Sequence, residues 1–107
     1  KCADGNGGEN FYHHFADCSS VKALFDKILK VPQDETVPDQ WQSQILARVM
    51  LAHKVVFVSE PAVKDQILKM KMDFSDSLDK ALAAALKEKG KNCKLTIIPD
   101  GVSVIVK

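Results

Sequence analysis

The sequence predicts an α/β fold, a three-layer α/β/α sandwich with a mostly parallel sheet and a C-terminal antiparallel hairpin. Short runs rich in β-branched residues alternate with amphipathic helical segments, an order typical of right-handed crossovers in a parallel sheet. The run at residues 54–59 shows no alternation, as expected for a strand buried on both faces. Residues 94–98 and 102–106 are predicted to be strands, and the Pro-Asp-Gly sequence between them favours a tight turn, which predicts the hairpin.

Composition predicts one ordinary globular domain covering residues 1–107. The chain is 46% hydrophobic and 27% charged, with 15 Lys and Arg against 14 Asp and Glu, giving a net charge of +1. The basic residues are scattered, so the charge pattern predicts no nucleic-acid partner and no anionic lipid surface. Because no apolar run approaches the ~20 residues of a membrane helix, we expect no membrane partner and a cytoplasmic location.

The number and spacing of the three cysteines predict that they are reduced thiols. Cys2, Cys18 and Cys93 are odd in number, widely spaced and contain no C-x-x-C pair. This pattern argues against both a disulfide framework and a thiolate zinc site.

The chain starts without methionine, and its glycine-rich residues 1–9 are typical of a loop leaving a strand. We therefore expect an excised C-terminal piece of a larger protein.

Two amphipathic helices are predicted in the first third of the chain. Residues 9–16 carry three aromatic side chains at helical spacing, and residues 21–29 carry an apolar stripe preceded by capping serines at 19–20. His13 and His14 are adjacent, so on a helix they diverge by about 100° and do not readily share a metal ion. The following loop at 31–38 contains two prolines, and its neighbouring carboxylates are expected to be solvated.

The central helix is predicted to begin near Pro38 and to contain the only tryptophan. Trp41, Ile45, Val49 and Ala52 share one face, and the stripe is widened by Leu46, Met50 and His53. We therefore expect the helix to lie between layers of the domain. The first turn carries the polar side chains of Gln40, Gln42, Ser43 and Gln44. Two interpretations stay open: either the indole lines a cleft beside these amides, or it plugs the core while they are solvated.

Further elements follow the strand at 54–59. Pro61 is expected to open a short helix through Leu68, with a brief extended segment at 69–72. A longer helix is predicted at 78–89, with Gly90 as its stop. The side chains expected to point inward from this helix are Leu78, Leu82, Ala85 and Leu86.

Three motifs then carry a family resemblance. They are CADGNGGENFY at residues 2–12, PDQWQSQILA at 38–47 and IIPDGVSVI at 97–105. In this order they resemble the C-terminal domain of the lactate racemase family, and the resemblance covers essentially the whole chain. The middle and last motifs are the more specific.

The resemblance implies that the parent protein interconverts the enantiomers of a 2-hydroxy acid by hydride transfer to a nickel-pincer nucleotide. The family's cofactor-bearing lysine, nickel-binding histidine and acid/base histidines lie in the N-terminal domain, which is outside this chain. His13, His14 and His53 therefore inherit no such role. For the isolated chain we expect no catalytic residue, no metal site, no bound cofactor and no activity.

For this domain, the resemblance implies a part that closes over the cofactor cleft and contributes to the substrate pocket. Trp41 is the residue carried over as substrate-binding, and Gln40 and Gln42 are weaker candidates. The expected partners are the small 2-hydroxy acid and the protein's own N-terminal domain. The alternative is a non-catalytic binding or structural domain of a divergent paralogue, because one fold often hosts several functions.

Overall fold

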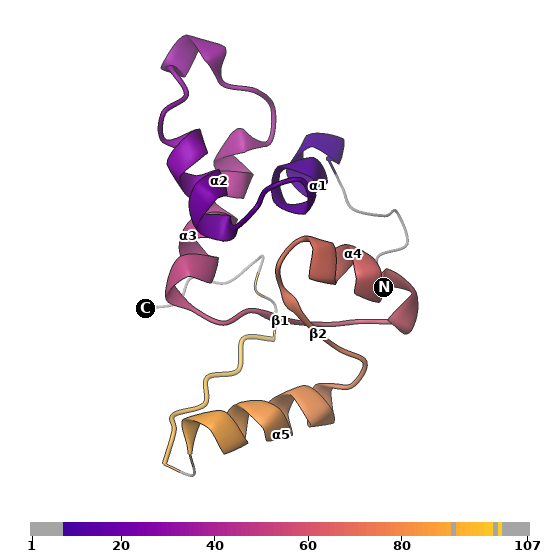
Figure 1. Cartoon of the computed structure of the whole chain (residues 1–107). Helices are drawn as coiled ribbons and strands as arrows, with labels where there is room; N and C mark the ends of the chain where they lie inside the picture. Colours follow the sequence, from indigo (N-terminus) through magenta and orange to yellow (C-terminus); the bar gives the residue numbers. More distant parts are fainter. Residues whose placement is uncertain (1–7, 91, 100, 102–107) are drawn as a thin grey trace.

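The structure, a computed structural model, describes residues 8–90, 92–99 and 101 and combines helices with a small sheet. The elements follow in chain order (Figure 1): α1 Glu9–Ala16, α2 Val21–Ile28, the 3-10 turn η1 Gln33–Glu35, α3 Gln40–Ala52, β1 Val56–Val58, the 3-10 turn η2 Pro61–Val63, α4 Lys64–Lys69, β2 Asp73–Ser75 and α5 Leu78–Lys89. The α/β class predicted from the sequence is confirmed in this coarse form.

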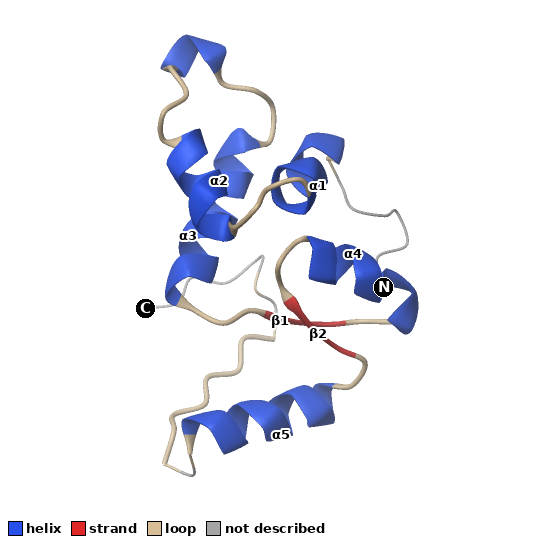
Figure 2. Ribbon diagram, in the orientation of Figure 1, coloured by secondary structure: helices blue, strands red, loops and turns tan. Residues whose placement is uncertain are grey.

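The sheet of the described residues consists of β1 and β2, which pair in parallel. Phe57 lies opposite Phe74, and Asp73 N donates to Val55 O at 3.0 Å where the ladder begins. Figure 2 shows α4 and α5 on opposite sides of this strand pair. A two-stranded sheet is too small to establish the expected three-layer sandwich, which is therefore not confirmed.

The core lies among α1, α2, α3 and α4 rather than around the sheet. Helix α3 packs against both α2 and α1, and α1 also contacts α4. The buried apolar side chains form one cluster: Phe15, Leu24, Ile28, Ala47, Ile67, Met70 and Met72. The predicted helices at 9–16 and 21–29 are confirmed by their positions, because their apolar stripes supply Phe15, Leu24 and Ile28 to this cluster.

The predicted apolar stripe of α3 is confirmed only at its margin, where Leu46 and Met50 pack against the core. Its central positions are exposed. Trp41 is 64% exposed, Ile45 46% and Val49 38%. The buried side of the helix instead carries Ser43 and Ala47. These positions lie two residues away from the predicted stripe, hence about 200° around the helix. The small side chains allow α1 and α2 to approach α3 closely, which an indole would prevent.

The expected antiparallel hairpin is not confirmed. Residues 94–98 form no strand, and the second expected strand at 102–106 lies outside the described residues. Leu95, Ile97 and Ile98 are exposed large hydrophobic side chains in the described structure. A strand exists only where a neighbour pairs its backbone groups, and the described residues provide no such neighbour for 94–98.

The second strand also differs from its expected place. The extended segment expected at 69–72 is displaced to Asp73–Ser75, because α4 continues to Lys69 and a turn follows. Lys71 makes this turn with a left-handed backbone, φ 65°. β1 is only partly covered, so the expectation of a strand buried on both faces is wrong for Val56 and Val58.

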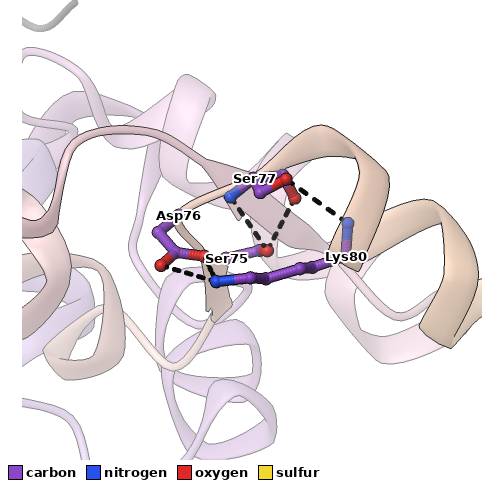
Figure 3. A network of polar contacts seen from close by, with 4 residues as sticks. All are labelled: Ser75, Asp76, Ser77 and Lys80. Atoms are coloured by element: carbon purple, nitrogen blue, oxygen red, sulfur yellow. Dashed lines mark hydrogen bonds and ion pairs between the residues drawn. The ribbon is translucent and has the colours of Figure 1, made fainter.

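Helix α5 occupies its predicted bounds. Gly90 ends it with φ 86°, a conformation that glycine adopts without steric cost. At its start, the Ser77 hydroxyl accepts from Lys80 N, and Lys80 Nζ donates to both oxygens of Asp76 (Figure 3). The expectation of an inward face is wrong for Leu78 and Leu86, which are 69% and 40% exposed, whereas Leu82 is half-buried and Ala85 lines a cavity toward the strands. No residue of α5 is fully buried.

Candidate functional site

The first turn of α3, which carries the predicted site residues, begins at an unusual N-cap. Asp39 has φ 66° and ψ −2°, the left-handed region that non-glycine residues seldom occupy. Its carbonyl oxygen accepts two hydrogen bonds from Ser43, one from the backbone N–H at 3.1 Å and one from the hydroxyl at 3.2 Å. Asp39 thus starts the helix through its backbone rather than its side chain.

A histidine from α1 reaches the same turn. Nδ1 of His14 lies 2.7 Å from the hydroxyl oxygen of Ser43, which is wholly buried. The neighbouring His13 lies 3.0 Å from the carboxylate of Asp17 on its own helix. The two adjacent histidines therefore diverge, as their spacing predicts, and only His14 contacts α3.

The surroundings of His14 favour its neutral form. Partial burial of the imidazole is the main cause that lowers the pKa of His14 below its ordinary value of 6.5, and the nearby Lys27 ammonium acts in the same direction. The Asp39 carboxylate opposes this shift. A neutral imidazole keeps one ring nitrogen without a proton, so His14 can donate at one nitrogen and accept at the other.

Gly8, at the N-cap of α1, lies directly against Asp39. A Cβ built on Gly8 would collide with the Asp39 carboxylate. The carboxylate therefore stands at the positive end of α1, where a negative charge is favourable. Helix α1 thus contacts the start of α3 at two points, Asp39 through Gly8 and Ser43 through His14.

A cavity of about 640 Å³ lies beside this contact. It is bordered by residues of α1, α2 and the loop that leads into α3. Its charged lining residues are the basic Lys27 and the acidic Asp17 and Glu35. The lining residues are His13, His14, Asp17, Cys18, Ser19, Ala23, Leu24, Lys27, Ile28, Val31, Glu35, Val37 and Gln40.

The three predicted site residues do not converge on this cavity. Gln40 is half-buried and lines it, whereas Trp41 and Gln42 are exposed. Consecutive residues on a helix point about 100° apart, so the three side chains spread around the first turn. Sequence reasoning missed His14 and Ser43, because nothing in the sequence pairs two polar residues 29 positions apart.

A second cavity of about 410 Å³ lies between α5 and the strand pair. Lys54 borders it and bridges two acidic groups, with Nζ 3.0 Å from Glu88 and 3.5 Å from Asp73. The hydrogen bond that Lys54 Nζ donates to the Glu88 carboxylate is the main cause that raises the pKa of Lys54, and the same bond lowers the pKa of Glu88. These exposed charges neutralise each other and leave no activated acid or base there.

The described residues also bear on metal binding and on membrane insertion. Nowhere among them do three His, Cys, Asp or Glu side chains gather closely enough to hold a metal ion. Cys18 and Cys93 are free thiols, and Cys2 lies outside the described residues. Within the same residues, every helix falls short of the length and apolar character needed to cross a membrane.

Comparisons with known proteins agree over nearly the whole chain. The family model of the lactate racemase C-terminal domain matches residues 1–106. The lactate racemase of Lactiplantibacillus plantarum is 44% identical over 104 residues, which cover 97% of this chain and 24% of the relative. The lactate racemase of Thermoanaerobacterium thermosaccharolyticum is 42% identical over 107 residues, covering 100% of this chain and 25% of the relative.

The fold agrees as well. The structure of the lactate racemase apoprotein from Thermoanaerobacterium thermosaccharolyticum superimposes on this chain with a TM-score of 0.92 at 42% identity, covering 100% of this chain and 26% of that one. The chain thus spans about a quarter of the length of the relatives it matches. Sequence and fold together place this chain in the lactate racemase C-terminal domain family.

Proposed function

We propose that the full-length protein containing this chain is a racemase or epimerase of 2-hydroxy acids, and that this domain closes over its substrate. The observation that carries the proposal is the match of residues 1–106 to the lactate racemase C-terminal domain, together with 42% and 44% identity to two lactate racemases. At this level of identity over a whole domain, the fold and the placement of site residues are normally shared.

Within this domain, we propose that Trp41 contributes a wall of the substrate pocket. The indole is 64% exposed, although it is the only tryptophan of the chain and stands on a helix start that α1 holds in place. Tryptophan combines a large apolar surface with one N–H donor. Such a wall excludes water from the reacting carbon and can bind one polar group of the substrate.

The two glutamines that flank Trp41 differ in their exposure to solvent. Gln40 lines the cavity between α1 and α2, whereas Gln42 is exposed like Trp41. We propose Gln42 as the amide that accompanies the indole at the substrate, because both project away from the domain. Gln40 would then contribute by filling the cavity side of the same turn.

The resemblance also implies a nickel-pincer nucleotide, which would supply the hydride acceptor of the full-length protein. The described residues offer no cluster of metal ligands, so they do not fit the group and no step through it is assigned to them. We propose that the remaining three quarters of the protein bind it. The role of this domain is then confined to positioning substrate and excluding water.

The test is chiral analysis of several 2-hydroxy acids after incubation with the cofactor-loaded, full-length protein. We expect racemisation of at least one acid, and we expect Trp41→Ala to lower kcat on the order of ten-fold or more, because a pocket wall fixes the reacting geometry. Trp41→Phe keeps the apolar wall and is expected to lose less.

Two outcomes would count against the proposal. If the loaded protein converts none of the acids, the domain serves a binding or structural role in a divergent paralogue. If the acids racemise but Trp41→Ala turns over at the normal rate, the indole is an ordinary surface residue and the substrate wall lies elsewhere. Circular dichroism of each variant separates loss of activity from loss of folding.

A further inference from the structure

We propose that His14 and Ser43 are positioning residues, which fix the first turn of α3 and thereby the direction in which Trp41 leaves the domain. The catalytic consequence rests on the proposed function, whereas the geometry can be tested without any activity. The proposal begins from the hydrogen bond between the His14 ring and the Ser43 hydroxyl, which joins α1 to α3 at 2.7 Å.

The burial of Ser43 makes this bond hard to replace. Its relative exposure is 0%, so no water can reach the hydroxyl from outside. A buried hydroxyl without partners costs more free energy than a hydrogen bond ordinarily contributes. Within the described residues, the Ser43 hydroxyl is satisfied by His14 and by the Asp39 carbonyl, and a movement of α1 away from α3 would break the bond to His14.

The two hydrogen bonds of Ser43 share one hydroxyl hydrogen. When Ser43 donates it to the carbonyl oxygen of Asp39 at 3.2 Å, its oxygen accepts the shorter bond from Nδ1–H of His14. When His14 carries its proton on Nε2 instead, Ser43 donates to Nδ1. In both tautomers the contact between α1 and α3 is kept.

The same network reaches Trp41 through the backbone. The Asp39 carbonyl that accepts from the Ser43 hydroxyl also accepts the first backbone bond of α3, and Asp39 is held with φ 66°. Trp41 follows two residues later and is mostly exposed, so its own contacts restrain it little. The orientation of the indole therefore depends on the rotation of this turn.

Three variants separate positioning from mere packing. His14→Leu removes the hydrogen-bond partner while filling similar space, and His14→Asn restores an amide N–H at the place of Nδ1. Ser43→Ala removes the other partner with the smallest change of volume and serves if His14→Leu does not fold. The matched control is His13→Leu, because His13 neighbours His14 but contacts Asp17 on its own helix.

The first measurement is the 19F resonance of Trp41 in the full-length protein labelled with 5-fluorotryptophan, assigned by its loss in Trp41→Phe. We expect His14→Leu and Ser43→Ala to shift or broaden this resonance, while His14→Asn and His13→Leu leave it in place. An unmoved resonance in a folded Ser43→Ala protein would overturn the proposal, whatever the enzyme does.

The second measurement is turnover of the full-length protein loaded with cofactor. We expect His14→Leu to lower kcat about ten-fold, with recovery to within about two-fold in His14→Asn. Equal kcat in His14→Leu and the unchanged protein, or equal loss in His14→Leu and His14→Asn, would refute the positioning role. If the unchanged protein has no turnover, the proposed function fails, and the 19F result alone decides this inference.

Discussion

At the residue scale, the contact between Gly8 and Asp39 shows how closely the start of α1 approaches the start of α3. The backbone of Gly8 has φ −61°, which any residue can adopt, so its conformational freedom is not the reason for the glycine. A Cβ would instead meet the Asp39 carboxylate. The backbone of Asp39 is held by Ser43, so the carboxylate would make room by rotating its side chain.

We therefore expect Gly8→Ala to lower the free energy of unfolding by about 1 kcal/mol or less, because the Asp39 carboxylate must leave its place at the start of α1. Asp39→Gly removes the carboxylate and accepts the left-handed backbone at no steric cost. In that background, Gly8→Ala should cost much less. Urea denaturation of the four proteins gives this double-mutant cycle, and additive effects would show that the two residues do not meet.

At the element scale, α3 has two contrasting faces. Ser43 and Ala47 face α1 and α2, while Trp41, Ile45 and Val49 form an exposed apolar stripe on the other side. Contiguous exposed apolar side chains are typical of interaction surfaces. Since the chain spans about a quarter of its relatives, we propose that this stripe packs on the rest of the full-length protein.

Ile45→Glu tests this stripe. In the 107-residue chain the side chain is 46% exposed, so we expect the free energy of unfolding to change by about 0.5 kcal/mol or less. In the full-length protein the charge would be buried at the interface, which should accelerate proteolysis between the domains. Leu29→Glu, on α2 and 58% exposed, is the control. Equal sensitivity of both variants would argue against a docking role for α3.

At the scale of the whole molecule, stability should depend on pH through His14. Its pKa is lowered in the folded protein by burial and by Lys27, with Asp39 in opposition. The unfolded chain, whose histidine keeps its ordinary pKa, then binds more protons than the folded chain below pH 6.5. The stabilisation is therefore complete above pH 6.5 and is lost as the pH falls toward the lowered pKa.

We expect the free energy of unfolding to fall as the pH drops through the ordinary histidine pKa of 6.5, and to fall less in His14→Asn. Urea denaturation at several pH values measures both slopes. His53→Asn is the matched control, because His53 ends α3 and is exposed to solvent. If the two variants flatten the dependence equally, His14 has no special part in it.

Much of the local structure could be predicted from the sequence, because it depends on short-range signals. Helical periodicity located α1 and α2, Ser20 was expected among the caps of α2 and its hydroxyl accepts from Ala23 N, and Gly90 ended α5. The family could also be predicted, because three motifs occur in the expected order along nearly the whole chain. These features require no knowledge of which elements meet.

The candidate site was predicted only in part. Trp41 was singled out by its rarity and by the resemblance, and of its two open interpretations the exposure of 64% contradicts the one in which the indole plugs the core. Periodicity identifies an apolar stripe, but it cannot tell whether that stripe faces this domain or another one. The partner that α1 supplies to the first turn, His14, was not predicted, because α1 and α3 become neighbours only when the chain folds.

The sequence by itself determined where the helices begin and end, the α/β class and the family, since backbone propensities and capping act within a few residues. Only the tertiary structure decided which face of α3 is buried. A wholly buried serine is tolerated there because His14 and the Asp39 carbonyl satisfy it, so the close approach of α1 excludes the indole. Packing and hydrogen bonding between residues distant in the sequence therefore decide which face of α3 is buried, and they leave Trp41 facing outward.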